Sequence, residues 1–319
     1  MKTRLLLSAL LALPGAAHAA KTVIRVGYFP NVTHAQGVIG SRLTAEGHGW
    51  FEARLGPGVE IQWFAFNAGP SAMEAVFAGS IDLTYVGPNP ALNAYIRSGG
   101  DEIRVLAGAA EGGAALVVAG DGRIKVPADF RGRKVATPQF GNTQDVAARA
   151  WLKKQGFQIT QTGGDVTVVP AANPDQLALL SRGDVDAVWT VEPWVTRLEQ
   201  EAGGKVYLEQ GDAVTTLLVS SVRFLREHPD LAATFRAAHA ELTAWINTHE
   251  VEARGLVRAG LSAAVHRDMP AELVAGAWHR LRFTAELRPA QIGGLVADAQ
   301  SVGFLRDALP LDRLFSGKP

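Results

Sequence analysis

Short β-prone runs alternate with helical patterns over the first two thirds of the chain. Thr22–Tyr28 (TVIRVGY) alternates apolar with polar positions and predicts a strand. Ala35–Ala45 predicts a helix, and Val59–Phe66 predicts a second strand that ends at the breakers in Asn67–Pro70. Strands that alternate with helices are typical of an α/β protein with a mainly parallel sheet.

The same alternation continues along the chain until the pattern becomes helical. Further strands are predicted at Ile81–Val86, Ile103–Ala110, Ala115–Ala119, Val166–Val169, Val185–Trp189 and Val214–Ser220, with helices after Pro70, after Pro90, over Pro174–Arg182 and from about Pro193. From Val222 onward the pattern is helical almost to the end, including Leu231–Thr248 and Glu272–Leu281.

The stretch Lys134–Leu152 (KVATPQFGNTQDVAARAWL) predicts a short strand, a broken turn and a helix. Asn142 is a good N-cap, and Asp145 three residues later gives an arrangement like a capping box. The helix start then leaves free backbone N–H groups beside Asn142, Thr143 and Gln144, which suits a small anion. An ordinary strand–turn–helix with a well-formed cap explains the same residues.

Two segments of the chain repeat each other at a spacing of 104 residues. Pro70 falls on Pro174, Gly79 on Gly183, Asp82 on Asp186 and Tyr85 on Trp189, and the apolar positions between them keep the same register. Both segments predict a helix, a tight Gly turn and a strand that starts apolar–Asp. The repeat predicts two lobes of the same plan that face each other across a cleft.

Ligands of open α/β sheets bind beyond the carboxyl ends of the strands, so the loops that follow the strands supply the candidate site. The candidate ligand-binding residues are Asn31, His34, Gly69, Pro70, Ser71, Gly87, Pro88, Asn89, Asn142, Thr143, Gln144, Trp189, Glu192 and Trp194. Small residues at these helix starts let the backbone approach a ligand closely, and His34 and Ser71 add side-chain donors.

The residues near the end of the second repeat have two interpretations each. Trp189 either packs in the core or borders the apolar part of an organic ligand, and Trp194 would be a wall of the same pocket if Glu192 faces the cleft. Glu192, in the sequence TVEPW, is either a structural loop carboxylate or a cleft residue. In the cleft it would repel a bare inorganic anion and attract an ammonium group.

The first nineteen residues have the pattern of a secretory signal peptide. Lys2 and Arg4 precede the apolar run Leu5–Leu13, and Ala17–Ala19 offers small residues at the cleavage position, so Ala20 is the predicted first mature residue. The chain has no cysteine, and therefore neither a lipid-acceptor cysteine nor a disulfide framework. These features predict a periplasmic protein that is free in solution.

The composition narrows the class of partner. The chain has 31 basic and 31 acidic residues, and removal of Lys2 and Arg4 leaves 29 against 31. Such a balance disfavours nucleic acid or an anionic membrane surface as a partner. About 300 residues also exceed what one hydrophobic core usually organises, which favours two lobes.

Catalytic signatures are missing from the sequence. It contains no G-x-S-x-G elbow, no phosphate-binding P-loop and no dinucleotide fingerprint, and no histidine pair has metal-ligand spacing. We therefore expect no catalytic residues, no metal and no cofactor, and a protein that is not an enzyme.

Several of these segments resemble one known family. GYFPNVTHA, NAGPSAMEAVFAGSIDLTYVGPNPAL, KVATPQFGNTQDVAARAWLKKQG and VWTVEPW are similar to periplasmic substrate-binding proteins of the nitrate/sulfonate/taurine class of ABC importers. The resemblance implies the type II periplasmic binding fold, with a ligand cleft between two lobes. It also implies an ABC permease as partner, and we expect a monomer. The expected division is 1–19 signal peptide, 20–115 first lobe, 116–215 second lobe, and 216–319 return to the first lobe with the C-terminal helices.

The combined interpretation is a periplasmic solute-binding protein for a small organic anion, an alkanesulfonate or a taurine-like sulfonate. The anionic head would lie among the helix starts, and the organic tail would point toward Trp189, Glu192 and Trp194. Alternatives that the sequence leaves open are an inorganic anion such as nitrate or bicarbonate, an enzyme similar to the pyrimidine-precursor synthases of thiamine biosynthesis, and a binding protein that reports to a chemoreceptor.

Overall fold

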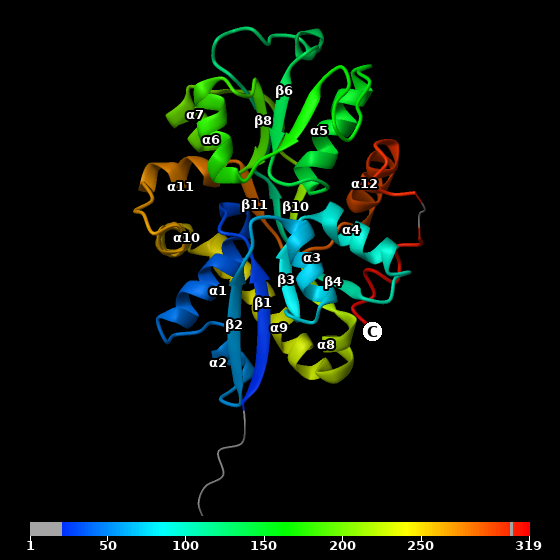
Figure 1. Ribbon diagram of the computed structural model, residues 1–319. Helices are drawn as coiled ribbons and strands as arrows, with labels where there is room; N and C mark the ends of the chain where they lie inside the picture. Colours follow the sequence, from blue (N-terminus) through cyan, green and yellow to red (C-terminus); the bar gives the residue numbers. More distant parts are fainter. Residues whose placement is uncertain (1–20, 307–308) are drawn as a thin grey trace, which may run out of the picture.

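Two β-sheets, each covered by helices on both faces, form the two lobes of the molecule (Figure 1). The computed structural model describes residues 21–306 and 309–319, so the predicted signal peptide lies outside the described residues. Within these ranges no helix has both the length and the apolar character needed to cross a bilayer.

The sheet of the first lobe has six strands in the order β11-β4-β10-β3-β1-β2. Their bounds are β1 Thr22–Tyr28, β2 Val59–Ala65, β3 Leu83–Val86, β4 Ile103–Gly112, β10 Val214–Ser221 and β11 Leu281–Phe283. β1 pairs in parallel with β2 and β3, whereas β10 runs antiparallel to β3 and β4, and β11 antiparallel to β4.

The sheet of the second lobe has five strands in the order β7-β6-β8-β5-β9. Their bounds are β5 Ala114–Val118, β6 Lys134–Thr137, β7 Thr167–Pro170, β8 Ala187–Val191 and β9 Lys205–Gln210. β6 is parallel to β7 and β8, and β5 is antiparallel to β8 and β9.

The helices are distributed over both lobes. They are α1 Ala35–Ala45, α2 Glu52–Leu55, α3 Gly69–Phe77, α4 Pro88–Arg97, α5 Thr143–Lys154, α6 Asn173–Arg182, α7 Trp194–Ala202, α8 Val222–Glu227, α9 Pro229–Thr248, α10 Glu250–Val265, α11 Ala271–Trp278 and α12 Pro289–Ser301, with short 3-10 turns at Val32–His34 and Pro127–Phe130. The helices α8–α12 follow the return strand β10 and include the predicted C-terminal helical region.

Both sheets are mixed, which differs from the mainly parallel sheets expected. The strands of the strand–helix series are parallel, but the chain passes from β4 into β5 and returns from β9 into β10. A strand that enters a sheet from the neighbouring lobe arrives from the opposite direction, so β5 and β10 pair antiparallel. Two strands were also missed: β9, and β11 at the end of the segment predicted to be helical. β11 has only three residues and forms because it completes the edge of the sheet beside β4.

Two core clusters cover the faces of each sheet. In β1, Ile24, Val26 and Tyr28 all belong to the cluster shared with α1, α9 and α10, because alternate residues of a strand share a face. Gly27 points to the other face, where an added Cβ would lie 2.6 Å from Thr84 Oγ1. The alternation of residues along β1 therefore determines which side chains face the α1, α9 and α10 layer and which face the opposite layer.

The repeat at 104 residues is a repeat of backbone structure. β3 begins at Leu83 and β8 at Ala187, and the glycines before them have positive φ angles of 68° at Gly79 and 74° at Gly183. The aspartate before each strand accepts a hydrogen bond from a backbone N–H of the neighbouring strand. Asp82 accepts from Arg25 N at 2.9 Å, and Asp186 accepts from Lys134 N at 3.0 Å.

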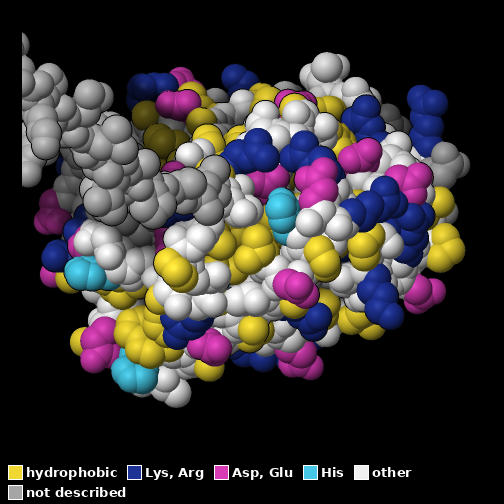
Figure 2. Space-filling model, turned by 90° about the horizontal axis from the view of Figure 1, so that it is seen from below, with side chains coloured by type: hydrophobic (Ala, Val, Ile, Leu, Met, Phe, Trp, Pro, Cys, Tyr) yellow, Lys and Arg dark blue, Asp and Glu magenta, His cyan; other side chains and the backbone are white. Residues whose placement is uncertain are grey.

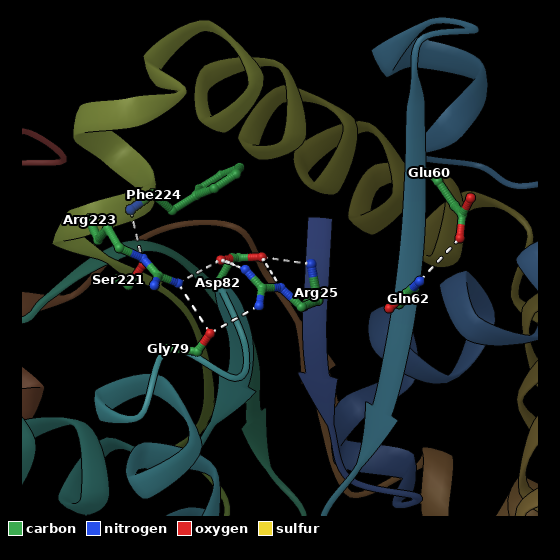
Figure 3. A network of polar contacts seen from close by, with 8 residues as sticks. All are labelled: Arg25, Glu60, Gln62, Gly79, Asp82, Ser221, Arg223 and Phe224. Carbon is green, nitrogen blue, oxygen red and sulfur yellow. Dashed lines mark hydrogen bonds and ion pairs between the residues drawn. The ribbon is translucent and has the colours of Figure 1, made fainter. Parts of the chain in front are cut away.

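Figure 3 shows how Asp82 anchors the start of β3. Its carboxylate accepts from Arg25 Nε at 3.0 Å and from Arg223 Nη2 at 3.2 Å, and both guanidinium groups also donate to Gly79 O. The Asp82 side chain is only 5% exposed. The carboxylate therefore ties β1, β3 and α8 together at the end of the sheet that lies away from the predicted cleft.

The surface around this end of the first lobe carries charges of both signs. On the face seen in Figure 2, Lys and Arg side chains lie among Asp and Glu side chains, with apolar side chains between them.

We predict that Asp82→Ala lowers the free energy of unfolding by about 2–4 kcal/mol, because a buried carboxylate that accepts several charged hydrogen bonds is lost. Chemical denaturation measures the change. Asp101→Ala is the matched control, since Asp101 is 66% exposed in its pair with Arg313 and should cost less than about 0.5 kcal/mol. Equal losses in the two variants would contradict the anchoring role of Asp82.

Candidate ligand-binding site

A small cavity lies between the two lobes. The first lobe contributes residues after β1, before and within α3 and α4, and in β10, and the second lobe contributes the starts of α5 and α6 and the end of β8. The lining residues are Phe29, Asn31, Thr33, His34, Asn67, Ala68, Gly69, Gly87, Pro90, Pro138, Asn142, Thr143, Gln144, Asn173, Val191 and Thr215. Its volume is about 20 Å³, and none of these described lining residues is a lysine, an arginine, an aspartate or a glutamate.

The start of α5 forms one wall of the cavity and has the predicted cap. Asn142 Oδ1 accepts a hydrogen bond from Asp145 N at 2.8 Å. The Asp145 carboxylate does not return to Asn142 N, as a full capping box would require, but accepts from Gly141 N at 3.0 Å and from Thr137 Oγ1 at 2.9 Å. Asn142 Nδ2 also donates to Gln144 Oε1 at 3.0 Å. The loop from β6 to α5 is therefore stabilised by hydrogen bonds among its own residues and those that flank it.

A buried ion pair completes this arrangement. Arg149, one turn after Asp145, donates from Nε to both carboxylate oxygens at 3.1 Å. Its other nitrogens donate to Thr160 O at 2.7 Å and Val168 O at 3.2 Å. The side chains of Asp145 and Arg149 are 0% and 2% exposed, so each group depends on the other for its charge compensation.

Two helix starts from different lobes meet at the cavity. Asn89 N, in the first turn of α4, donates to Thr143 Oγ1 at the first residue of α5, at 3.4 Å. This approach requires Gly87, because a Cβ there would lie 2.3 Å from Thr143 Oγ1. Gly69 allows a similar approach of α3 to Pro90, whose Cγ lies 2.3 Å from the site of an added Cβ. The positive ends of helix dipoles from both lobes therefore converge.

The loop after β1 supplies buried polar atoms to the cavity. His34 is 3% exposed and packs against Phe29, with ring centroids 4.2 Å apart. Among residues 21–306 and 309–319, neither His34 Nδ1 nor Thr33 Oγ1 has a hydrogen-bond partner. Buried polar groups without a partner are rare in proteins, so these two atoms are candidates for contact with a bound molecule.

Burial keeps the His34 imidazole neutral. It lowers the pKa of His34 from 6.5 to about 3, because a charged ring would lose its hydration. His239, in the core below, has its pKa lowered to about 4 by burial, which its hydrogen bond to Gly108 O opposes. His34 therefore faces the cavity as a neutral ring with one N–H and one acceptor nitrogen.

The structure brings together half of the sequence-predicted residues. Asn31, His34, Gly69, Gly87, Asn142, Thr143 and Gln144 line the cavity. Pro70 lines a neighbouring groove, and Ser71 donates its hydroxyl to Ala68 O at 2.9 Å. Pro88 and Asn89 are buried in the first turn of α4 beside the cavity.

Glu192 does not line the cavity, contrary to the cleft interpretation. Its carboxylate is 0% exposed and accepts from Arg280 Nη1 at 2.9 Å and from Thr196 Oγ1 at 2.9 Å. Burial raises the pKa of the Glu192 carboxyl, while the hydrogen bonds from Thr196 and Arg280 oppose this effect. The sequence could not indicate this pairing, because Arg280 lies 88 residues later in the chain.

The two tryptophans also lie outside the cavity lining. Trp189 is 1% exposed in the core of the second lobe, and its Nε1 donates to Gln210 Oε1 at 3.1 Å. Trp194 is 6% exposed and donates from Nε1 to Asn31 Oδ1 at 2.9 Å. Trp189 is thus a core residue, and Trp194 fixes the side chain of Asn31 across the two lobes.

Sequence reasoning missed several lining residues. Phe29, Asn67, Ala68, Pro90 and Val191 lie beside or within the loops that follow the strands, and Thr215 lies in β10. Asn173, at the first residue of α6, was not considered. The 104-residue repeat could have found it, because the equivalent position in the first lobe is Gly69 at the start of α3.

Comparison with solved structures identifies the fold. The alkanesulfonate-binding protein SsuA of Xanthomonas axonopodis pv. citri superimposes with a TM-score of 0.71 over 89% of this chain and 93% of its own, at 21% identity. The nitrate-binding protein NrtA of Synechocystis PCC 6803 superimposes with a TM-score of 0.70 over 90% and 83%, at 16% identity. At these identities the likeness shows the fold, and the predicted two-lobed periplasmic binding fold is confirmed.

Sequence comparison then gives the family. The NMT1-like family model matches residues 17–258, and the chain belongs to that family. A protein assigned as an aliphatic sulfonates-binding protein of Escherichia coli K12 is 31% identical over 62% of this chain and 58% of its own, and the taurine-binding periplasmic protein of that strain is 29% identical over 56% and 55%. The chain therefore spans somewhat more than half the length of these relatives, which are named as binding proteins and not as enzymes. The predicted resemblance is confirmed.

We predict that Asp145→Asn lowers the free energy of unfolding by about 3–5 kcal/mol, because Arg149 remains buried without a counter-charge. Asp175→Asn is the matched control, an exposed aspartate in the first turn of α6, and should cost about 0.3–1 kcal/mol through the helix dipole. Urea denaturation compares the two. A loss for Asp145→Asn within the range of the control would contradict the buried pair.

The lowered histidine pKa values predict a pH dependence of stability. Between pH 6.5 and the folded pKa the unfolded state binds more protons than the folded state, so stability falls as the pH falls. From pH 7 to pH 5 each buried histidine should contribute a loss of about 2 kcal/mol. His34→Gln should remove one such contribution, whereas His48→Gln, at an exposed position, should keep the wild-type difference. Denaturation at both pH values decides this, and an unchanged difference in His34→Gln would refute it.

Proposed function

We propose that the chain is the periplasmic solute-binding component of an ABC importer and that it captures a small organic anion, an alkanesulfonate or a taurine-like sulfonate. The observation that carries the proposal is the convergence of the α4 and α5 starts from opposite lobes at Thr143 Oγ1. Around them lie neutral amides and hydroxyls and the unpartnered atoms of Thr33 and His34. Such a donor set suits a compact, weakly basic anion without a metal or a positive side chain.

The site lies between the two lobes, so ligand binding there can be coupled to closure of the lobes. An anion that accepts hydrogen bonds from both lobes binds the closed arrangement more tightly than an open one, so it shifts the population toward closure. Closure then presents both lobes together to a membrane permease. The names of the sulfonate- and taurine-binding relatives support this ligand class.

The alternatives have less support. An inorganic anion such as nitrate fits the donors, and a nitrate-binding protein shares the fold. Apolar and ring-bearing side chains, among them Phe29, Pro90, Pro138 and Val191, line the same cavity and favour a ligand with an organic part. The thiamine-precursor enzyme alternative has no support among the relatives described above. A binding protein that reports to a chemoreceptor would use the same ligand and the same site.

We predict that ethanesulfonate and taurine bind in isothermal titration with micromolar dissociation constants, at least about tenfold tighter than nitrate or bicarbonate. The measurement uses the mature protein at constant ionic strength. Nitrate binding tighter than every sulfonate would overturn the organic-anion assignment. Failure of all these anions at millimolar concentration would overturn anion capture itself.

A glycine pair tests whether the two helix starts form the site. Gly87→Ala should weaken sulfonate binding by about tenfold or more, because the added Cβ meets Thr143 Oγ1 and pushes the α5 start away. Gly58→Ala is the matched control, since a Cβ there has open space around it, and should leave the affinity unchanged. Equal affinities for the two variants would place the ligand elsewhere.

A further inference from the structure

A second, larger hollow adjoins the cavity, and we call it the outer groove. Its volume is about 780 Å³, within the range of sites that hold organic molecules. It lies between α3 and α4 of the first lobe, the loop before α5, and the segment after α12. Its lining residues are Pro70, Met73, Glu74, Phe77, Pro90, Asn93, Ala94, Ile96, Arg97, Phe140, Gly141, Gln161, Gly303, Phe304, Leu305 and Arg306.

The outer groove adjoins the anion cavity at residues of two chain segments. Pro90 lines both. At the start of α3, Gly69 lines the cavity and Pro70 lines the groove. In the loop before α5, Pro138 lines the cavity and Phe140 lines the groove. A ligand whose head lies among the helix starts would therefore have the outer groove beside it.

The outer groove is lined by polar as well as apolar residues, and three of the apolar residues are aromatic. Phe77 and Phe140 are 44% and 39% exposed, and the rings of Phe140 and Phe304 lie 4.8 Å apart. Three exposed or half-exposed aromatic side chains that gather beside a polar cavity form the kind of patch that marks a binding surface.

We propose that the outer groove binds the organic tail of the anion, and that this tail is a long alkyl or an aryl group. The proposal rests on the proposed function, because the head group must lie in the cavity. The charged residues of the groove support an uncharged tail. Arg97 and Arg306 outnumber Glu74, so an ammonium tail meets more positive than negative charge, and taurine gains nothing from the groove. The wall at Trp189, Glu192 and Trp194, expected from the sequence, is not the tail site.

The test is a series of ligands that share one head group. Isothermal titration compares ethane-, butane- and octanesulfonate, benzenesulfonate and taurine, with wild-type protein and with Phe140→Ala. A fully buried methylene raises affinity about fourfold. In the half-open groove we expect octanesulfonate to bind at least about tenfold tighter than ethanesulfonate. Phe140→Ala should reduce octanesulfonate binding about tenfold and ethanesulfonate binding less than twofold.

Two further variants test the opposite side of the groove and serve as a control. Phe304→Ala should reproduce the tail-dependent loss from the opposite side of the groove. Phe64→Ala is the matched control, a phenylalanine of β2 with 38% exposure outside the groove, and should bind every ligand as the wild type does. Affinity that is flat with tail length, or an equal loss for short and long tails, would overturn the tail site alone. Absence of any sulfonate binding would overturn the proposed function together with it.

Discussion

The Asp145 carboxylate accepts hydrogen bonds from three parts of the second lobe, and the cavity wall at the start of α5 depends on it. Thr137 at the end of β6, Gly141 in the loop and Arg149 on α5 all donate to it. Arg149 in turn satisfies two carbonyl groups of distant segments. Because both charges are buried, neither can be removed without leaving the other unpaired. The start of α5 is therefore held in one geometry, with its N–H groups directed at the cavity.

The relation between the lobes depends on contacts at two sides of the molecule. On one side Arg280, just before β11, pairs with Glu192 and with Glu199 of the second lobe, at 2.9 and 2.8 Å. On the other side α12 lies between α4 and α5, where Lys154 pairs with Asp298 at 2.6 Å and Val146, Ala299 and Leu305 form a small apolar cluster. The exposed pair contributes little to stability by itself. The Arg280–Glu192 pair contributes more to the contact between the lobes, because Glu192 is buried.

Both kinds of contact come from the C-terminal part of the chain, which follows β10, the strand that returns the chain to the first lobe. Arg280 and α12 thus connect residues of the first-lobe sheet region with the second lobe, around a cavity that both lobes line. A change in the separation of the lobes must alter these pairs together with the α4–α5 approach. This coupling is the physical basis on which binding at the cavity can alter the shape of the whole molecule.

The local pattern of the sequence was enough for the elements that carry the fold. Periodicity placed β1, α1 and the capped start of α5, and the 104-residue repeat indicated two lobes whose strands start at equivalent aspartates. The family resemblance led to the fold class. These features are local, because caps, breakers and alternation act within a few residues.

The tertiary structure alone decided which polar and aromatic residues line the cavity and the outer groove. Glu192 was assigned to the cleft as a candidate, yet Arg280, 88 residues away in the chain, holds it in a buried pair. Trp189 packs in the core, while Phe140 and Phe304, from two distant segments, meet at the outer groove. β11 forms only because β4 offers an edge to pair with. Each of these outcomes depends on partners remote in sequence, and a local pattern holds no information on which remote partner a side chain finds.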